Sequence, residues 1–405
     1  MERQGTGGVT PYPLSTLPFG VVSTAADSRH RVGVLVGDRV LDVAPLAAAD
    51  GIGAARALAA PTLNPFLALG RGGWSEVRAW LAQRLTGDAA GVREHLLPLA
   101  AVTTQLPVEV ADYVDFYSSQ HHAENVGRIF RPDSEPLTPN WKHLPIGYHG
   151  RAGTVVVSGT PVRRPTGQRR PPGSAGPIFG PSQRLDIEAE VGFVVGMPSA
   201  LGEPVGVSAF REHVFGVVLV NDWSARDLQA WEYVPLGPFL GKSFATSISA
   251  WVVPLDALEE AWVPAPAREV EPLPYLREAE PGGLDLALEV EWNGTVVSRP
   301  PFASMYWTAA QQLAHMTVNG ASLRTGDLFA SGTVSGPEPG QRGSFLELSW
   351  GGRDELRLDD GSTRTFLADG DTVVLRASAP GPEGATVELG EVRGTVLPAF
   401  DSATP

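Results

Sequence analysis

Apolar and polar positions near the start of the chain alternate with a period of two. Residues 18–45 contain PFGVVS and RVGVLVGDRVLDV, and Gly37-Asp38 separates two of the alternating runs. Such alternation places every second side chain on one face of a strand, and Gly-Asp suits a tight turn. The pattern predicts a small antiparallel barrel or roll.

A helical period follows between residues 74 and 85. Apolar side chains recur there at intervals of three and four, namely Trp74, Val77, Trp80, Leu81 and Leu85. This spacing gathers them on one face of a helix, so we expect a helix at 74–85. The chain changes character after Leu106-Pro107, which places a domain boundary near residue 108.

Strand-like runs separated by glycine turns dominate the rest of the chain. We predict strands at residues 154–157, 187–195, 214–220, 284–292, 344–350 and 372–375. The pairs Asn293-Gly294, Asp360-Gly361 and Asp369-Gly370 have the residue types of hairpin turns. A helix is expected at 304–317, because Asn319-Gly320 can end it. Residues 163–181, rich in proline, glycine and arginine, are predicted to form a long surface loop.

Composition narrows the range of partners. The chain has 31 Lys and Arg against 45 Asp and Glu, and its formal charge of −14 would repel phosphate backbones and anionic lipids. Nucleic acid and membranes are therefore not expected as partners. The chain has no cysteine, so a metal must be bound by oxygen or histidine. We find no secretory signal pattern and no apolar run of roughly 18 residues, which favours a cytoplasmic location.

Three acidic residues alternate with apolar ones in the stretch LDIEAEVGFVV. In a strand, Asp186, Glu188 and Glu190 share one face. One interpretation is an acidic row on the solvent side of a half-exposed strand. The other is a metal site, because carboxylates crowded on one face repel one another unless a cation neutralises them.

A second group of polar residues follows the apolar run Val217–Val220. Asp222 lies where this buried strand is expected to end, and Ser224 with Asp227 resembles a capping box that opens a helix. Further cationic and amide groups follow: Arg226, Gln229 and Lys242. The simpler alternatives are a helix cap for Asp222 and a surface ion pair for the arginine, but neither accounts for the whole group.

His122 is the imidazole best placed to act as a base. A general base needs an orienting partner, and Glu347, between two leucines in a predicted strand, must find either solvent or such a partner. A structural histidine is the alternative. His121 does not form a zinc pair with His122, because adjacent histidines in regular secondary structure cannot point at one ion.

Several segments together resemble the fumarylacetoacetase family. They are residues 115–127 (DFYSSQHHAENVG), 140–168 and 221–254, with the motifs SGTVSG and LELSW near the C-terminus. The resemblance covers nearly the whole chain. It implies a mainly β, α+β fold, in which a small N-terminal SH3-like β-barrel domain (1–108) precedes a larger catalytic domain, a mixed β-sandwich roll (109–405).

The resemblance also implies roles for individual residues. The ligands of a catalytic Ca2+ would be Asp115, Glu188, Glu190 and Asp222. His122 would be the base and Glu347 its orienting partner. The substrate would contact Tyr117, Arg131, Tyr148, Gln229, Tyr233 and Thr333. Developing negative charge would be stabilised by Arg226, Gln229 and Lys242, and a second, structural Mg2+ would lie beside Lys242, Thr246 and Asp222. Ala245 stands where the family commonly has glycine.

The implied activity is metal-dependent hydrolysis of the carbon–carbon bond of 4-fumarylacetoacetate to fumarate and acetoacetate, the last step of tyrosine and phenylalanine degradation, by a homodimer. Two other functions stay open. One is a decarboxylase, isomerase, hydratase or acylpyruvate hydrolase acting on a smaller 2-oxo acid. The other is a non-catalytic β protein that binds Ca2+ through its acidic row, and such a protein would have no use for a base at His122.

Overall fold

The structure is a computed structural model that describes residues 16–86 and 90–400. Its N-terminal part has five strands and five helices. The strands are β1 (Phe19–Thr24), β2 (Arg31–Val36), β3 (Arg39–Asp42), β4 (Leu96–Pro98) and β5 (Val102–Gln105). The helices are α1 (Val43–Ala49), α2 (Ala55–Leu58), α3 (Asn64–Leu67), α4 (Gly70–Thr86) and α5 (Ala90–Arg93). The Gly37-Asp38 turn between β2 and β3 and the helix at 74–85 are both confirmed.

The N-terminal strands continue into the main sheet of the protein. β1 pairs with β17 (Trp251–Pro254), and the strand order is β4-β3-β2-β1-β17-β14-β13-β22-β6-β7. The central members of this sheet are β13 (Ala189–Val195), β14 (Val214–Asp222), β22 (Leu328–Ala330), β6 (Tyr113–Phe116) and β7 (Gly147–His149). β16 (Thr246–Ile248) pairs with β14, and β8 (Val155–Val157) pairs with β16. The proposed boundary at residue 108 falls between β5 and β6.

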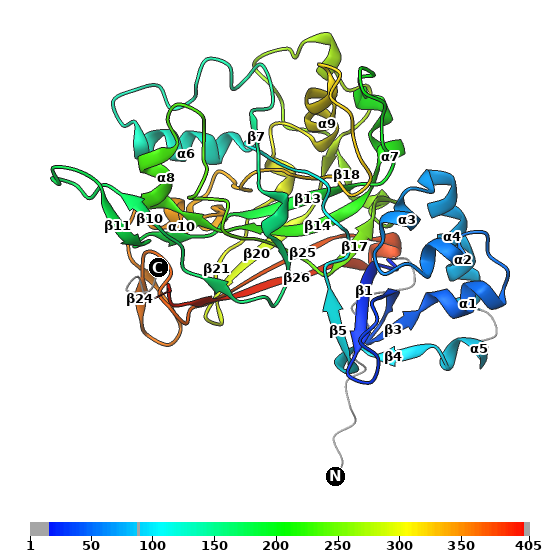
Figure 1. Cartoon of the computed structure of the whole chain (residues 1–405). Helices are drawn as coiled ribbons and strands as arrows, with labels where there is room; N and C mark the ends of the chain where they lie inside the picture. The colour runs from blue at the N-terminus through cyan, green and yellow to red at the C-terminus, as the bar shows by residue number, and fades with distance from the viewer. Residues whose placement is uncertain (1–15, 87–89, 401–405) are drawn as a thin grey trace.

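A second sheet packs against the main one. Its order is β21 (Thr295–Ser298), β20 (Ala287–Trp292), β25 (Thr372–Pro380), β26 (Thr386–Leu397) and β9 (Val162–Arg163). In Figure 1 these strands lie below β13 and β14, and α6 (Gln120–Phe130), α8 (Arg226–Glu232) and α9 (Ala309–Thr317) lie above them. The larger core joins the two sheets, as the expected mainly β, α+β fold requires.

Both faces of β14 are covered, which explains its unbroken apolar run. Val217 and Leu219 point into the core between the two sheets, and Val218 and Val220 point into the core shared with the N-terminal part. A strand buried on both faces shows no alternation of apolar and polar residues. Its last residue, Asp222, lies on the face of Val218 and Val220, four and two positions before it.

The remaining elements are short. They are the strand pairs β10 (Thr166–Arg169) with β11 (Ile178–Pro181), β12 (Leu185–Asp186) with β15 (Ser224–Ala225), β18 (Trp262–Val263) with β19 (Gly283–Leu284), and β23 (Leu356–Arg357) with β24 (Thr363–Arg364), and the helices α7 (Phe210–His213) and α10 (Phe345–Leu348). Within the described ranges, every helix is too short or too polar to span a bilayer.

Some local predictions were wrong. Residues 163–181 are not a plain loop, because β10 and β11 pair there as a hairpin. The expected strand at 344–350 contains α10 instead, whose first turn is capped by Ser344. The helix predicted from residue 304 begins at Ala309, because Thr308 forms a capping box with Gln311.

Two predicted turns or caps also differ from expectation. The capping box at Ser224 is absent: Ser224 Oγ donates to the carbonyl of Asp222, and Asp227 accepts hydrogen bonds from Ser182 and Gln183. The turn at Asp369-Gly370 closes no hairpin, because β25 pairs with β20 and β26. The turns at Asn293-Gly294 and Asp360-Gly361 are confirmed as hairpins.

Candidate active site

Four buried carboxylates meet where strands of the main sheet end. Asp115 lies near the end of β6, Glu190 in β13, Asp222 at the end of β14, and Glu188 just before β13. One carboxylate oxygen from each of the four lies within 4.8 Å of the other three, and none of the four residues is more than 5% exposed. Glu190 is opposite Val220 in the β13–β14 register, so it shares a face with Asp222.

Several of these oxygens have no protein partner. Both oxygens of Glu190 and Oδ1 of Asp115 are buried without a hydrogen bond from the described residues. Burial, with a contribution from neighbouring carboxylates, raises the pKa of both groups well above the ordinary range. An unpartnered buried carboxylate is costly, and a hard cation would supply the missing partner. The donor set therefore fits a metal bound by oxygen.

Two buried cations lie against the same carboxylates. Lys242 Nζ contacts a carboxylate oxygen of both Glu188 and Asp222, and Arg226 Nη2 lies 2.8 Å from Glu188 Oε1. Burial alone would raise the pKa of Glu188, but Lys242 and Arg226 lower it below its usual value. Burial would also lower the pKa of Lys242, but Asp222 and Glu188 raise it. Lys242 is therefore an ammonium ion. The prediction of a surface ion pair for Arg226 is wrong, because Arg226 and its partner Glu188 are both buried.

Asp222 has two further hydroxyl partners. Tyr148 donates its phenolic hydrogen to Asp222 Oδ2 at 3.1 Å, and Thr246 Oγ1 donates to Oδ1 at 3.3 Å. Thr246 faces Asp222 in the β14–β16 register. Ala245, where the family commonly has glycine, is buried in the larger core.

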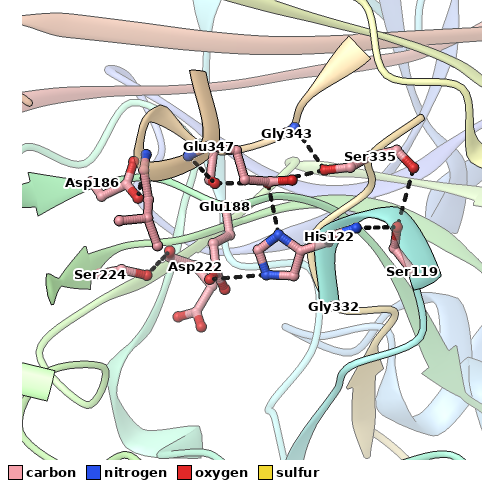
Figure 2. A network of polar contacts seen from close by, with 12 residues as sticks. Ser119, His122, Asp186, Glu188, Asp222, Ser224, Gly332, Ser335, Gly343 and Glu347 are labelled. Carbon is pink, nitrogen blue, oxygen red and sulfur yellow. Dashed lines mark hydrogen bonds and ion pairs between the residues drawn. The ribbon is translucent and has the colours of Figure 1, made fainter. Parts of the chain in front are cut away.

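His122 and Glu347 form a buried pair beside this group (Figure 2). His122 lies in the first turn of α6, which Ser119 caps, and its Nδ1 is 2.7 Å from Glu347 Oε2. Its Nε2 is 4.0 Å from Glu188 Oε1. Because a carboxylate accepts, Nδ1 carries the hydrogen and Nε2 is the nitrogen free to accept a proton at the acidic group.

Three other donors hold Glu347. Asn125 donates to Oε1 at 3.0 Å, and Ser335 and Ser344 donate to Oε2 at 3.0 and 2.8 Å. Burial alone would raise the pKa of Glu347, but His122, Asn125 and Ser344 lower it. Sequence reasoning missed all three. Asn125 is 222 residues from Glu347, and the strand expected at 344–350 would have placed Ser344 and Glu347 on opposite faces.

A cavity of about 440 Å3 opens onto this machinery. Its lining includes all six residues expected to contact the substrate, namely Tyr117, Arg131, Tyr148, Gln229, Tyr233 and Thr333, together with Asp115, His122, Glu188, Arg226 and Lys242. Glu347 and Glu190 are not part of the lining. Asp222 and Thr246 line a smaller adjoining cavity of about 140 Å3, which also reaches Lys242.

The polar lining is arranged for recognition. Thr333 Oγ1 is buried without a hydrogen-bond partner in the described chain. Arg131 donates to the carbonyl of Pro136, and no carboxylate of the described residues pairs with it. The ring of Tyr117 meets the His122 ring edge-on, with 5.3 Å between centroids. A cation without an acidic partner in a cavity is suited to an anionic ligand.

One member of the predicted acidic row lies elsewhere. Asp186 was expected on the same face as Glu188 and Glu190, but its carboxylate is outside the group of four. The regular strand is interrupted, since β12 ends at Asp186 and β13 begins at Ala189. The solvent-facing interpretation of the row is wrong as well, because all three acids are buried.

Comparison with known proteins places this geometry in a family. Residues 15–107 match the family model described as fumarylacetoacetase N-terminal, and residues 112–397 match fumarylacetoacetate (FAA) hydrolase C-terminal. Fumarylacetoacetase of Homo sapiens is 48% identical over 96% of this chain and 97% of its own. Fumarylacetoacetase of Arabidopsis thaliana is 44% identical over 97% of both chains.

Solved structures share the fold at lower identity. A fumarylacetoacetate hydrolase from Exiguobacterium antarcticum has a TM-score of 0.55 at 17% identity, covering 94% of this chain and 99% of its own. A maleylpyruvate hydrolase from Sphingobium has a TM-score of 0.53 at 15% identity, covering 95% and 100%. The near-complete matches in sequence, on a fold that gathers the motif residues around one cavity, show that the chain belongs to the fumarylacetoacetase family.

Proposed function

We propose that this protein hydrolyses 4-fumarylacetoacetate to fumarate and acetoacetate. The observation that carries the proposal is the His122–Glu347 pair. The free ring nitrogen of His122 is 4.0 Å from Glu188, one of the four clustered carboxylates, and His122 and Glu188 both line the cavity. The name of the relatives, at 44–48% identity over 97% of their length, supplies the substrate. A non-catalytic Ca2+-binding protein would leave the oriented base unexplained.

The metal-binding residues in this proposal are Asp115, Glu188, Glu190 and Asp222, with Ca2+ as the ion. When bound, a divalent cation polarises the diketone oxygens and stabilises the enolate charge that forms as the bond breaks. The unpartnered oxygens of Asp115 and Glu190 support this assignment. A second ion, Mg2+, is proposed beside Asp222, Thr246 and Lys242 from the resemblance; the Lys242 ammonium is already engaged by two carboxylates.

His122 would act as the general base. Glu347 holds the ring so that Nε2 accepts a proton from water, and the resulting hydroxide adds to the carbonyl carbon on the fumaroyl side. The carbon–carbon bond then breaks, fumarate leaves as a carboxylic acid that loses its proton, and the electron pair stays on acetoacetate as an enolate. The proton that His122 took from water then passes to the enolate carbon, directly or through a water molecule, which completes acetoacetate and returns His122 to its starting form.

Buried cations and amides would stabilise the charge that develops. Arg226 and Lys242 already meet Glu188 at the cavity wall, and Gln229 accepts from Arg226 Nη1 at 3.2 Å. Donors fixed in a site that excludes water need little reorganisation during the reaction. Arg131 would bind a carboxylate of the dianionic substrate, and Tyr117, Tyr148, Tyr233 and Thr333 would complete its contacts.

Assembly, location and metabolic role belong to the same proposal. We infer a homodimer that acts in the last step of tyrosine and phenylalanine degradation, as the resemblance implies, and a cytoplasmic location, as the sequence pattern favours. Size-exclusion chromatography with light scattering tests the dimer.

The ultraviolet absorbance of fumarylacetoacetate gives the direct test. We expect the purified protein to remove it, and both a chelator and His122→Ala to stop the reaction. Turnover that survives the chelator would overturn the metal-dependent mechanism. If the wild-type protein supplied with Ca2+ and Mg2+ leaves this substrate untouched but decarboxylates oxaloacetate, the protein is instead an enzyme that acts on a smaller 2-oxo acid.

A further inference from the structure

Asp186 is a buried acid that the proposed mechanism does not use. Its side chain is fully buried, and it lies outside the group of four carboxylates. It ends β12, directly before the irregular residues that lead to Glu188. A buried carboxylate is retained at low cost only where donors surround it, so its partners indicate its role.

Donors from three separate segments surround the Asp186 carboxylate. Oδ1 accepts the backbone N–H of Ile187 at 2.8 Å and of Phe345 at 2.7 Å. Oδ2 accepts the N–H of Leu346 at 3.1 Å and Nε of Arg226 at 2.8 Å. Every one of these contacts comes from a donor, as an ionised carboxylate requires.

The contact with Asp186 orients the guanidinium of Arg226, which lines the active-site cavity. Nε of Arg226 is bound to Asp186, which leaves Nη2 against Glu188 and Nη1 against Gln229. A guanidinium is planar, so holding one edge of it sets the direction of the other edge. Asp186 does not line the cavity, whereas Arg226 does.

Asp186 also supports the base, because it binds two backbone amides next to Glu347. Phe345 and Leu346 are the two residues before Glu347, whose carboxylate holds His122. Asp186 thus binds the backbone that positions Glu347 and also the side chain of Arg226. One carboxylate therefore holds both the segment that carries Glu347 and the side chain of Arg226. His122 Nε2 and Arg226 Nη2 both lie near Oε1 of Glu188, at 4.0 and 2.8 Å.

We propose that Asp186 is a positioning residue that holds Arg226 and the Glu347 segment in fixed relation, so that base and cation act on one substrate. The inference rests on the proposed function. Asp186→Asn tests it, because asparagine keeps the shape and one acceptor but has no second acceptor for Arg226 Nε and the Leu346 amide.

Asp371→Asn is the matched control. Asp371 is 4% exposed and accepts from the Ala368 amide at 2.8 Å and from Trp292 Nε1 at 3.1 Å, with Arg364 at 3.5 Å, but it is not in the cavity lining. Both substitutions remove one buried charge that binds a backbone amide and an arginine. A purely structural role for Asp186 would make the two variants behave alike.

We expect Asp186→Asn to lower kcat by about 10- to 100-fold with KM little changed, as loss of a supporting partner does, and Asp371→Asn to keep wild-type kcat. Combining Asp186→Asn with Glu347→Gln should reduce kcat by less than the product of the two single losses. If Asp186→Asn does not fold, Asp186→Glu, which keeps the charge on a longer arm, takes its place.

A second readout does not depend on turnover. The proton on His122 Nδ1, identified by its loss in His122→Ala, should give a downfield NMR signal that shifts in Asp186→Asn and not in Asp371→Asn. An unshifted signal, or equal kcat in the two variants, would overturn the positioning role. Wild-type protein that leaves the substrate untouched would instead overturn the proposed function, and the NMR comparison would still decide the positioning role.

Discussion

Glu347 carries its charge in a fully buried position where four donors surround the carboxylate, namely His122, Asn125, Ser335 and Ser344. Replacing it with glutamine keeps the shape but offers His122 Nδ1 a donor, which favours the tautomer with the hydrogen on Nε2. That tautomer cannot take a proton from water. We expect Glu347→Gln to lower kcat by about 100- to 10,000-fold. Ser344→Ala, which removes one of the other donors, should lower kcat far less. Equal reductions of kcat in the two variants would contradict the tautomer argument.

Asp327 provides a stability prediction with a defined pH range. Burial raises its pKa to about 6, although it accepts the Arg324 amide at 2.8 Å. The unfolded chain therefore ionises at lower pH than the folded one, so the charge destabilises the fold increasingly as pH rises from about 4 to 6. Asp327→Asn should stabilise the protein by about 1–2 kcal/mol at pH 8, allowing for partial solvent screening, and much less at pH 4.5. Urea unfolding at both pH values measures this, and an equal gain at both would refute it.

At the residue scale, the sequence identified the residues that carry the chemistry but not the contacts that support them. His122 and Asp222 stand in long family motifs, Glu188 stands in the row of alternating acids, and the structure brings the three side chains together. Asp186 is acidic and has the same spacing as Glu188 and Glu190, but a break in the strand turns it toward Arg226. Such a break depends on the packing of distant segments, which alternation along the chain does not encode.

Elements with strong periodicity or turn chemistry were predicted, and short ones were not. β14 and α4 have enough residues for their pattern to be distinctive. α10 has four residues, and its alternating sequence SFLELSW is equally compatible with a strand. Contacts from Ser344 and Asp186 to its amides select the helical turn. A helix this short has no independent stability, so tertiary contacts decide its form.

The close approach of β6 to the segment after β22 depends on Gly332. Its φ is +76°, and a Cβ there would lie 2.1 Å from the carbonyl oxygen of Phe116. Gly332→Ala must therefore displace Thr333 or the strand that carries Asp115. The free-energy cost of this displacement comes in addition to the roughly 1–2 kcal/mol that a left-handed conformation costs. Gly361→Ala is the control, since φ is +84° there and no atom lies within 4 Å. We expect thermal unfolding to show the larger loss for Gly332→Ala, together with a fall in kcat; similar losses would mean that the backbone adapts.

At the scale of the whole molecule, the topology explains how an acidic chain builds this site. Tyr113 and Val220 face the core shared with the N-terminal part, and two positions later on the same faces stand Asp115 and Asp222. The strand order brings β6, β22, β13 and β14 side by side, so their carboxylates converge at one edge of that core. The order of strands from distant parts of the chain was not predictable from local patterns.

Convergence of four carboxylates should make the fold dependent on metal. Without a cation, burial and neighbouring acids disfavour the charge on Glu190, whose oxygens have no hydrogen-bond partner in the described chain. Glu190→Gln should therefore raise the unfolding temperature of chelated protein. Ca2+ at about 100 times its Kd should stabilise the wild type by about 2.7 kcal/mol and the variant much less.

Because the pKa values of Asp115 and Glu190 are raised, binding should release protons and weaken as pH falls. Calorimetry in buffers of different ionisation enthalpy measures that release. Glu388→Gln is the control, because burial alone raises the pKa of Glu388 and it lies outside the group. A wild type that Ca2+ does not stabilise would contradict the assignment of these four residues as its ligands.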